Sequence, residues 1–305
     1  MAVLVPCRDE EAAIAQVVAA FRASLPSAVI YVYDNNSTDR TREVARAAGA
    51  VVRGEPLQGK GHVVRRMFSD IDADVYVLVD GDDTYDAAAA PLMVAKLLDE
   101  QLDMVNGARQ TEIQGAYRPG HRLGNVVLTG MVALIFGDRV QDLLSGYRVF
   151  SRRYVKSFPA LSVGFEIETE LTVHALELRM PVAEVNTRYK DRPVGSTSKL
   201  RTYRDGMRIL KTIINLTKGE RPLLFFSITS AFLGLVSLIL SYPVVDTYRR
   251  TGLVPRFPTA ILSTGIMIVA FLCLFCGLIL DMVTHGRREM KRLRYLEIDA
   301  PRRFD

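Results

Sequence analysis

The chain has 305 residues, of which 49% are hydrophobic and 24% are charged, so it is long and apolar enough to bury a core and is not a mostly disordered protein. Its net charge of +5 is unevenly spread: residues 1–198 carry 22 basic and 26 acidic side chains, whereas residues 199–305 carry 17 and 8. The basic second part needs an anionic neighbour, either nucleic acid or a lipid surface.

Short apolar runs alternate with helical patterns from the start of the chain. The apolar runs cover 2–5, 28–33, 51–52, 75–79 and 104–105, and the helical patterns cover 10–25, 39–48, 60–71 and 87–101. This alternation predicts an α/β fold with a mostly parallel sheet and helices on both faces. In such sheets the ligand site lies at the carboxyl ends of the strands.

Polar clusters follow three of these apolar runs, and one of them is strongly acidic. Asp80 and Asp82 come directly after the fourth run, separated by Gly81, which lets the backbone turn tightly. Oxygen ligands of this kind suit Mg²⁺ or Mn²⁺ held together with substrate phosphates. The alternative is a solvated acidic turn. Of the two acids that follow, Asp83 is a further candidate ligand, and Asp86 is expected to cap the helix that begins at Ala87.

Six motifs occur in order along the first two thirds of the chain. They are VPCRDEE at 5–11, YDNNSTD at 33–39, GKG at 59–61, DGD at 80–82, LSGYR at 144–148 and RPVGSTSK at 192–199. Together they resemble family-2 glycosyltransferases, which have the GT-A fold. The last two resemble the subgroup that transfers sugars to polyprenyl phosphates, such as dolichol-phosphate mannose synthase and undecaprenyl-phosphate glucosyltransferases.

The resemblance implies a nucleotide-diphosphate sugar as donor, with UDP-glucose favoured, and a polyprenyl phosphate, undecaprenyl phosphate, as acceptor. A single displacement would invert the anomeric carbon. The residues expected to act in catalysis are Asp82, Arg122 and Lys199; those expected to bind substrate are Pro6, Arg8, Glu10, Asp34, Lys60, Asp80, Gly81, Arg109, Ser145, Arg148, Arg192 and Ser198.

Several of these residues have a second interpretation. Lys60 could place a positive charge on the diphosphate or could be an exposed lysine at a helix start. Asp34 could bind the base or ribose or could cap the following helix. Glu10 suits the donor site and a first helical turn equally well. The chain also departs from the family pattern, because Arg8-Asp9 replaces the usual Tyr-Asn and Asn35 replaces the second acid of the usual Asp-Asp pair.

The expected acceptor removes the need for a general base. A phosphate monoester has a second pKa of about 6, so at neutral pH it is largely dianionic and already a nucleophile. The four histidines show no ligand spacing, so core or surface roles are expected. Arginines and lysines that hold two anionic substrates together matter more, which is why Arg109, Arg122, Arg148 and Lys199 are candidates.

The second part of the chain is predicted to be membrane-bound. The segments 222–245 and 257–280 contain no charged residue and are each long enough to span a bilayer, with the spans predicted at about 222–245 and 257–281. The basic residues that flank them place the N-terminal region in the cytoplasm. The predicted organisation is a catalytic domain at 1–198, an amphipathic interfacial helix at 199–221, a two-helix hairpin at 222–284 and, at 285–305, a cytoplasmic tail whose cations bind anionic headgroups in the cytoplasmic membrane.

Other functions fit the sequence less well. A processive polysaccharide synthase of the same fold would carry a Gln-x-x-Arg-Trp motif, and this chain has no tryptophan. A GDP-mannose-dependent mannose synthase remains an alternative, as does a catalytically silent scaffold. Nucleic-acid binding is not expected, because the basic residues flank hydrophobic spans. Relatives with two spans assemble through them, which makes a homo-oligomer the expected state.

Overall fold

The computed structural model describes residues 1–110, 142–164, 166–190, 218–219 and 221–302. The chain divides into two compact units. The first unit comprises Met1–Ile213 together with Lys291–Asp305, and the second comprises Ile214–Met290. The C-terminal residues therefore belong to the same unit as the N-terminal ones, and the second unit is an insertion between them.

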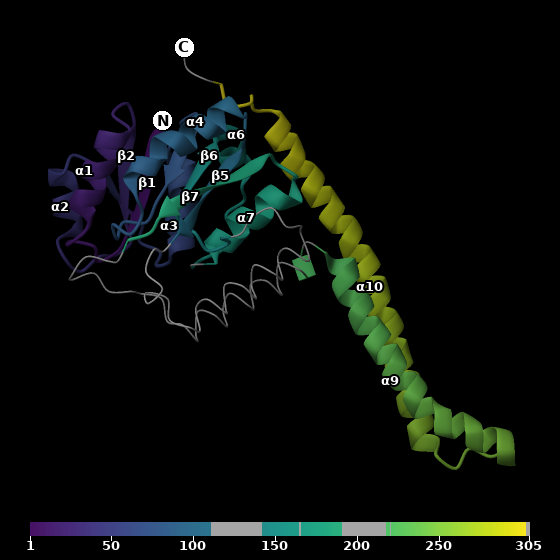
Figure 1. Cartoon of the computed structure of the whole chain (residues 1–305). Coiled ribbons are helices and arrows are strands. Elements are labelled where there is room, and N and C mark those ends of the chain that lie inside the picture. The colour runs from purple at the N-terminus through teal and green to yellow at the C-terminus, as the bar shows by residue number, and fades with distance from the viewer. Residues whose placement is uncertain (111–141, 165, 191–217, 220, 303–305) are drawn as a thin grey trace. The chain divides into compact units, whose positions relative to one another are not determined.

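The first unit alternates strands and helices, as the sequence predicts (Figure 1). Its strands are β1 (Ala2–Cys7), β2 (Val29–Asp34), β3 (Val51–Gly54), β4 (Val75–Leu78), β5 (Met104–Gln110), β6 (Arg148–Ser151) and β7 (Val182–Arg188). Its helices are α1 (Ile14–Ser24), α2 (Thr41–Ala47), α3 (Lys60–Asp70), the 3₁₀ turn η1 (Ala87–Ala89), α4 (Ala90–Asp99), α6 (Arg152–Ser157) and α7 (Ile167–Glu177).

The strands form one seven-stranded sheet in the order β3-β2-β1-β4-β6-β5-β7. The pairs among β3, β2, β1 and β4 are parallel, as is the pair of β5 and β7, whereas β6 runs antiparallel to both of its neighbours. The expectation of a mostly parallel sheet is confirmed. Because β1 lies between β2 and β4, the three loops that follow these strands start from neighbouring positions.

Two apolar cores cover the two faces of the sheet. One core contains the inward-facing residues of α1 and α4, including Phe21 and Met93. The other contains those of α3, α6 and α7, including Met67, Tyr154 and Leu171. Helices on both faces bury the central strands β1 and β4 almost completely, which explains their continuous apolar runs, whereas the edge strand β3 is largely exposed.

The second unit is built from two long helices, α9 (Pro222–Thr251) and α10 (Phe257–Leu296), the latter extending past the unit boundary. Each is long and apolar enough to cross a membrane. The helices contact each other through small residues: the Ser237 hydroxyl donates to the carbonyl of Ser263 at 2.7 Å, and a Cβ on Gly277 would lie 2.9 Å from that of Phe226. Small contact residues allow close backbone approach, which is typical of membrane helix pairs.

Both helices are longer than the predicted spans of 222–245 and 257–281, because each continues into polar sequence. The predicted interfacial helix at 199–221 lies outside the described residues, except for residues 218, 219 and 221.

Candidate active site

Three loops meet at one edge of the sheet, where β1, β2 and β4 end. Cys7, the last residue of β1, pairs with Asp34, the last residue of β2. Just after β4, the amide of Val79 donates to the carbonyl of Leu4 in β1 at 3.0 Å. The polar clusters that follow these strands are therefore neighbours, as expected for a site at the carboxyl ends of a parallel sheet.

The loops after β1 and β2 are joined by a series of hydrogen bonds. The amides of Asp9 and Glu10 donate to the hydroxyl oxygens of Ser37 and Thr41, each at 2.8 Å. In return, the amide of Thr38 donates to the Asp9 carboxylate at 2.7 Å. Glu10 is buried in this arrangement. The two loops thus form one ordered platform, because each satisfies the polar groups of the other.

Asp34 lies fully buried on this platform with one oxygen satisfied and one not. Its Oδ2 accepts a hydrogen bond from Arg42 Nε at 2.6 Å and one from the amide of Ser37 at 3.2 Å. Its buried Oδ1 has no hydrogen-bond partner among the described residues. A buried acceptor without a donor costs free energy, so a ligand N–H or O–H at this position would be stabilised.

Asn35 shows why the second acid of the family pattern is absent. Its side-chain amide donates to the carbonyls of Glu55 at 3.0 Å and Leu57 at 2.8 Å, and its Oδ1 accepts from the amide of Gly59 at 2.7 Å. A carboxylate could make only the last of these bonds. Asn35 therefore fixes the segment that leads to Lys60.

Lys60 opens α3 and is held between two carboxylates. Its Nζ lies 2.5 Å from Asp80 Oδ1 and 2.5 Å from Glu168 Oε1. The Lys60 and Glu168 side chains are 9% and 7% exposed, and that of Asp80 is 29% exposed. Although burial lowers the pKa of Lys60, the two carboxylates raise it above its ordinary value, and burial raises the pKa of Glu168. Lys60 is thus a buried, charged ion-pair residue rather than an exposed lysine.

The glycines on either side of Lys60 allow the chain to pack against another loop. Gly59 has φ of +139°, and an added Cβ would lie 2.3 Å from the carbonyl oxygen of Val163. A Cβ on Gly61 would lie 2.1 Å from the carbonyl oxygen of Ser162. Larger residues would displace this loop, so the Gly-Lys-Gly motif sets the position of Lys60 relative to the start of α7.

The acidic turn after β4 packs closely against β1. A Cβ on Gly81 would lie 2.3 Å from the sulfur of Cys7, so only glycine fits between Asp80 and Asp82. Asp82 is buried and accepts a hydrogen bond from the hydroxyl of Thr84 at 2.6 Å. At the end of the turn, Asp86 accepts from the amide of Ala88 at 3.0 Å, which confirms its predicted capping role.

Asp83 has an unusual backbone conformation and a carboxyl group with a raised pKa. Its φ is +55°, in the left-handed region. Burial raises the pKa of the Asp83 carboxyl; the charge of Lys190 lowers it, and that of Asp82 raises it. A bound cation would favour the ionised form of this carboxyl.

The side chains at this turn limit the kind of metal they could hold. Among the described residues, no group of three or more His, Cys, Asp or Glu side chains is placed to hold a metal ion. A pair of aspartates with Asp83 close by still fits a hard cation such as Mg²⁺ or Mn²⁺, which is commonly bound by one or two carboxylates plus water and substrate phosphates. A closed protein cage for zinc does not fit this donor set.

Arg148 and Ser145 do not have the substrate-binding positions expected for them. Arg148 is fully buried, and its guanidinium donates to the carbonyls of Ser145 at 3.0 Å and Leu143 at 2.8 Å and to the hydroxyl of Thr172 at 2.8 Å. Ser145 is also fully buried, and its hydroxyl donates to the carbonyl of Gly107 at 2.6 Å. These side chains hold the turn before β6, because their polar atoms are used by the protein itself.

Arg109 is engaged as well. Its guanidinium makes a two-point ion pair with Asp142, at 2.7 and 2.8 Å, and lies 5.6 Å from the ring centre of Tyr189. Burial raises the pKa of Asp142, but hydrogen bonds from Arg109 outweigh it, and the net pKa is lowered. The expected use of Arg109 as a free phosphate-binding cation does not match this pairing.

The remaining expected residues are divided between the rim of the site and the rest of the chain. Pro6 belongs to β1, and Arg8 lies just beyond it with a 44% exposed side chain, 3.5 Å from Asp9. Arg8 is therefore accessible at the platform where the family has tyrosine. Arg122, Arg192, Ser198 and Lys199 lie outside the described residues.

Glu168 is the member of this site that the sequence analysis missed. It lies on α7, whose buried residues include Glu168 and Glu170. The signal was the run GFEIETEL at 164–171, in which acids alternate with apolar and small residues on a helix that is buried on all sides. Charged residues are seldom buried without a partner, so this run indicates a buried cation in contact with the helix.

Comparisons with known proteins agree with this geometry. A sequence profile for the family described as Glycosyl transferase family 2 matches residues 2–158. Glycosyltransferase AglJ of Haloferax volcanii is 34% identical over 303 residues, 97% of this chain and 97% of that protein. A dolichyl-phosphate hexose transferase of the same organism is 29% identical over 221 residues, 72% of this chain and 95% of that protein.

A solved structure has the same fold. It is glucosyl-3-phosphoglycerate synthase from Mycobacterium tuberculosis in complex with Mn²⁺, uridine-diphosphate-glucose and phosphoglyceric acid. Its TM-score is 0.57 with 23% sequence identity, covering 70% of this chain and 78% of that one. The expected GT-A architecture of the first unit is thereby confirmed.

Proposed function

The chain belongs to glycosyltransferase family 2, and we propose that it moves a hexose from a nucleotide-diphosphate sugar, UDP-glucose in the first instance, to undecaprenyl phosphate at the cytoplasmic face of a membrane. The reaction is a single displacement that inverts the anomeric carbon. The observation that carries this proposal is the site at the carboxyl ends of the strands, where the buried side chains of Lys60 and Glu168 form one ion-paired cluster with the partly exposed Asp80.

The donor half of the proposal rests on the unsatisfied and charged groups of that edge. Asp34 offers a buried acceptor oxygen to an N–H of the base or a hydroxyl of the ribose. Exposed Arg8 can stack on a planar base. Lys60 supplies a fixed positive charge for the diphosphate, and the two carboxylates keep it protonated. A cation at Asp80 and Asp82 would stabilise the negative charge that develops on the leaving group.

The acceptor half rests on different observations. A relative over most of this chain is named a dolichyl-phosphate hexose transferase, and two helices of the second unit could span a membrane. A lipid phosphate is already a nucleophile at neutral pH, so the chain needs cations rather than a base. Arg122, Arg192, Ser198 and Lys199 remain the proposed contacts for this phosphate. Arg192, Ser198 and Lys199 precede α9 in the sequence, which suits an acceptor held at a bilayer surface.

The test is transfer by the purified full-length protein in liposomes that contain undecaprenyl phosphate. Radiolabelled UDP-glucose and GDP-mannose are supplied separately with Mg²⁺ or Mn²⁺, and label in the lipid phase is measured. We expect transfer from UDP-glucose and a loss of about 10²-fold or more in Asp82→Asn. Transfer from GDP-mannose alone would replace the donor in this proposal, and absence of transfer from either sugar would contradict the proposal as a whole.

A matched variant controls for simple loss of charge in the acidic turn. Asp86→Asn removes a carboxylate four residues away, and asparagine caps helices as well as aspartate does. Its transfer rate should stay close to that of the wild type. An equal loss in Asp86→Asn and Asp82→Asn would show that the turn as a whole, rather than a role of Asp82, determines the rate.

A further inference from the structure

The C-terminal segment Lys291–Arg302 is an integral part of the first unit. It contains the end of α10 and the residues that follow (Figure 1). The sequence predicts that this region is a tail whose cations bind lipid headgroups. Three cations of the segment are paired within the protein: Lys291 lies 2.7 Å from Glu177, Arg294 lies 2.6 Å from Glu297, and Arg302 lies 3.2 Å from Asp299.

The strongest anchor of this segment is Tyr295. Its hydroxyl donates to Asp103 Oδ2 at 2.7 Å, and its ring lies 4.7 Å from the guanidinium of Arg153. Asp103 is fully buried and also accepts from Arg153 at 2.5 and 2.9 Å and from the hydroxyl of Ser151 at 2.7 Å. Burial and the Asp103 carboxylate raise the pKa of the Tyr295 hydroxyl, so it remains a hydrogen-bond donor throughout the physiological range.

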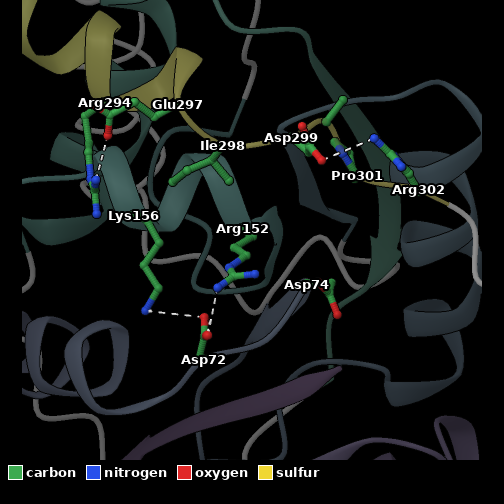
Figure 2. Close-up of a pocket in the computed structure, with 11 residues that line it drawn as sticks. Asp72, Asp74, Arg152, Lys156, Arg294, Glu297, Ile298, Asp299, Pro301 and Arg302 are labelled. Atoms are coloured by element: carbon green, nitrogen blue, oxygen red, sulfur yellow. Dashed lines mark hydrogen bonds and ion pairs between the residues drawn. The ribbon is translucent and has the colours of Figure 1, made fainter.

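The second anchor is the ion pair of Lys291 and Glu177. The side chains are 14% and 2% exposed, so the pair is largely removed from water. Breaking one partner of such a pair is costly, because the other charge stays buried. By contrast, Arg294 and Arg302 lie around an open cavity of about 1060 Å³, where Arg294 pairs with Glu297, and Arg302 with Asp299 (Figure 2). Specific anchors, rather than continuous packing, hold the segment.

These contacts have a consequence for the membrane hairpin. The hairpin residues Ile214–Met290 are joined to the first unit at both chain ends, through residue 213 and through Lys291. A helix pair tied at both ends has fewer accessible arrangements than one tied at a single end.

We propose that Lys291 and Tyr295 are positioning residues: by anchoring the C-terminal segment to the first unit, they restrict the hairpin and so favour transfer to an acceptor held in the bilayer. This role rests on the proposed function. It predicts that loss of the anchors affects a membrane-embedded acceptor and spares a dissolved one.

The test compares two acceptors with the full-length protein in liposomes. One acceptor is undecaprenyl phosphate in the bilayer, and the other is a short-chain prenyl phosphate that stays in solution. For Tyr295→Ala combined with Lys291→Met, we expect kcat/KM for the bilayer acceptor to fall about tenfold, with little change for the dissolved acceptor. Tyr295→Phe, which keeps the ring over Arg153 and loses one hydrogen bond, should show a smaller loss of the same kind.

Arg292→Met is the matched control, because Arg292 is an exposed cation next to Lys291. The single variants Lys291→Met and Arg292→Met are measured side by side: if headgroup binding explained the effect, they would lower the bilayer reaction equally, which would overturn the proposal. Equal loss with both acceptors, or no loss with either, would also overturn it. Wild-type protein that transfers to neither acceptor would remove the proposed function and, with it, this role of the segment.

Discussion

The two ends of the sheet both carry buried carboxylates paired with cations, but they differ in how completely their acceptors are satisfied. At the amino end, both oxygens of Asp103 accept hydrogen bonds, from Ser151, Arg153 and Tyr295. At the carboxyl end, one oxygen of Asp34 and one of Glu168 are buried with no partner among the described residues. A satisfied cluster holds elements together, whereas an unsatisfied one is suited to bind a ligand.

The largest expected effect on this comparison comes from removing the cation at the carboxyl end. Lys60→Met should lower kcat by about 10²–10³-fold, because the fixed charge beside the leaving group is lost. Steady-state transfer from UDP-glucose measures this effect. Lys96→Met, which breaks an exposed pair with Glu100 on α4, should leave kcat unchanged. If Lys60→Met kept a near-normal kcat, the ion-paired cluster at the carboxyl end of the sheet would be structural, like the Asp103 cluster at the amino end.

Substitutions at the amino end of the sheet should lower the free energy of unfolding rather than the rate of the reaction. Asp103→Ala leaves the guanidinium of Arg153 without its carboxylate, and we expect the free energy of unfolding of the first unit to fall by about 3 kcal/mol. Denaturant unfolding in detergent, followed by a probe in the first unit, measures the loss. Asp299→Ala, at an exposed pair with Arg302, should have no measurable effect. A lower kcat with a dissolved acceptor in folded Asp103→Ala at unchanged stability would contradict this division of roles.

A substitution at Asn35 should affect both stability and ligand binding, because its side chain holds the local backbone in place and lies beside the proposed donor site. Asn35→Asp restores the residue typical of the family yet loses two donated hydrogen bonds and places a carboxylate next to the carbonyls of Glu55 and Leu57. We expect a loss of about 2 kcal/mol in unfolding free energy and weaker nucleotide binding. Asn36→Asp, whose single bond to Pro56 is exposed, is the control. Tighter UDP binding by Asn35→Asp would mean that the family acid is functional here too.

The smallest expected effect concerns an unsatisfied group away from both ends. His174 is buried among Tyr154, Phe158 and Ser157, and its Nδ1 has no partner among the described residues. Burial, and then the charge of Lys291, lower its pKa to about 3, although Glu177 opposes this shift. The expectation that the histidines have core or surface roles agrees with this position.

The depressed pKa of His174 gives a signed pH dependence. The unfolded chain binds a proton near pH 6.5 and the folded chain does not, so stability is present above about pH 6.5 and falls below it, by about 1.4 kcal/mol per pH unit. Unfolding midpoints between about pH 7 and pH 5.5 measure the slope. His174→Gln should flatten it. An unchanged slope in that variant would assign the pH dependence to other groups.

The sheet and the three motif loops could be predicted because they depend on local signals. Apolar runs of strand length with polar residues after them place Asp34 and Asp80 at one edge once the sheet is parallel. The exact partners could not be predicted, since they depend on contacts between distant segments. Lys60 and Glu168 are 108 residues apart in the chain, and Tyr295 and Asp103 are 192 apart.

Two arginines show even more clearly that the partners of a side chain cannot be predicted from the sequence. Arg148 and Arg109 carry the charge and geometry that suit phosphate, and the sequence gives no sign that backbone carbonyls and Asp142 already use them. Composition identifies donors and acceptors, but only the folded chain determines which remain for a ligand.

Hydrogen exchange of the full-length protein, with and without UDP-glucose and Mn²⁺, tests most directly whether the carboxyl end of the sheet is the donor site. We predict slower exchange in the loops at 8–11, 34–41 and 79–86, which carry the proposed donor contacts Arg8, Asp34 and Asp80, and unchanged exchange around Asp103, Arg153 and Tyr295. GDP-mannose with Mn²⁺ serves as the competing donor. Protection confined to the amino end, or no protection in the three loops with either nucleotide sugar, would contradict the account.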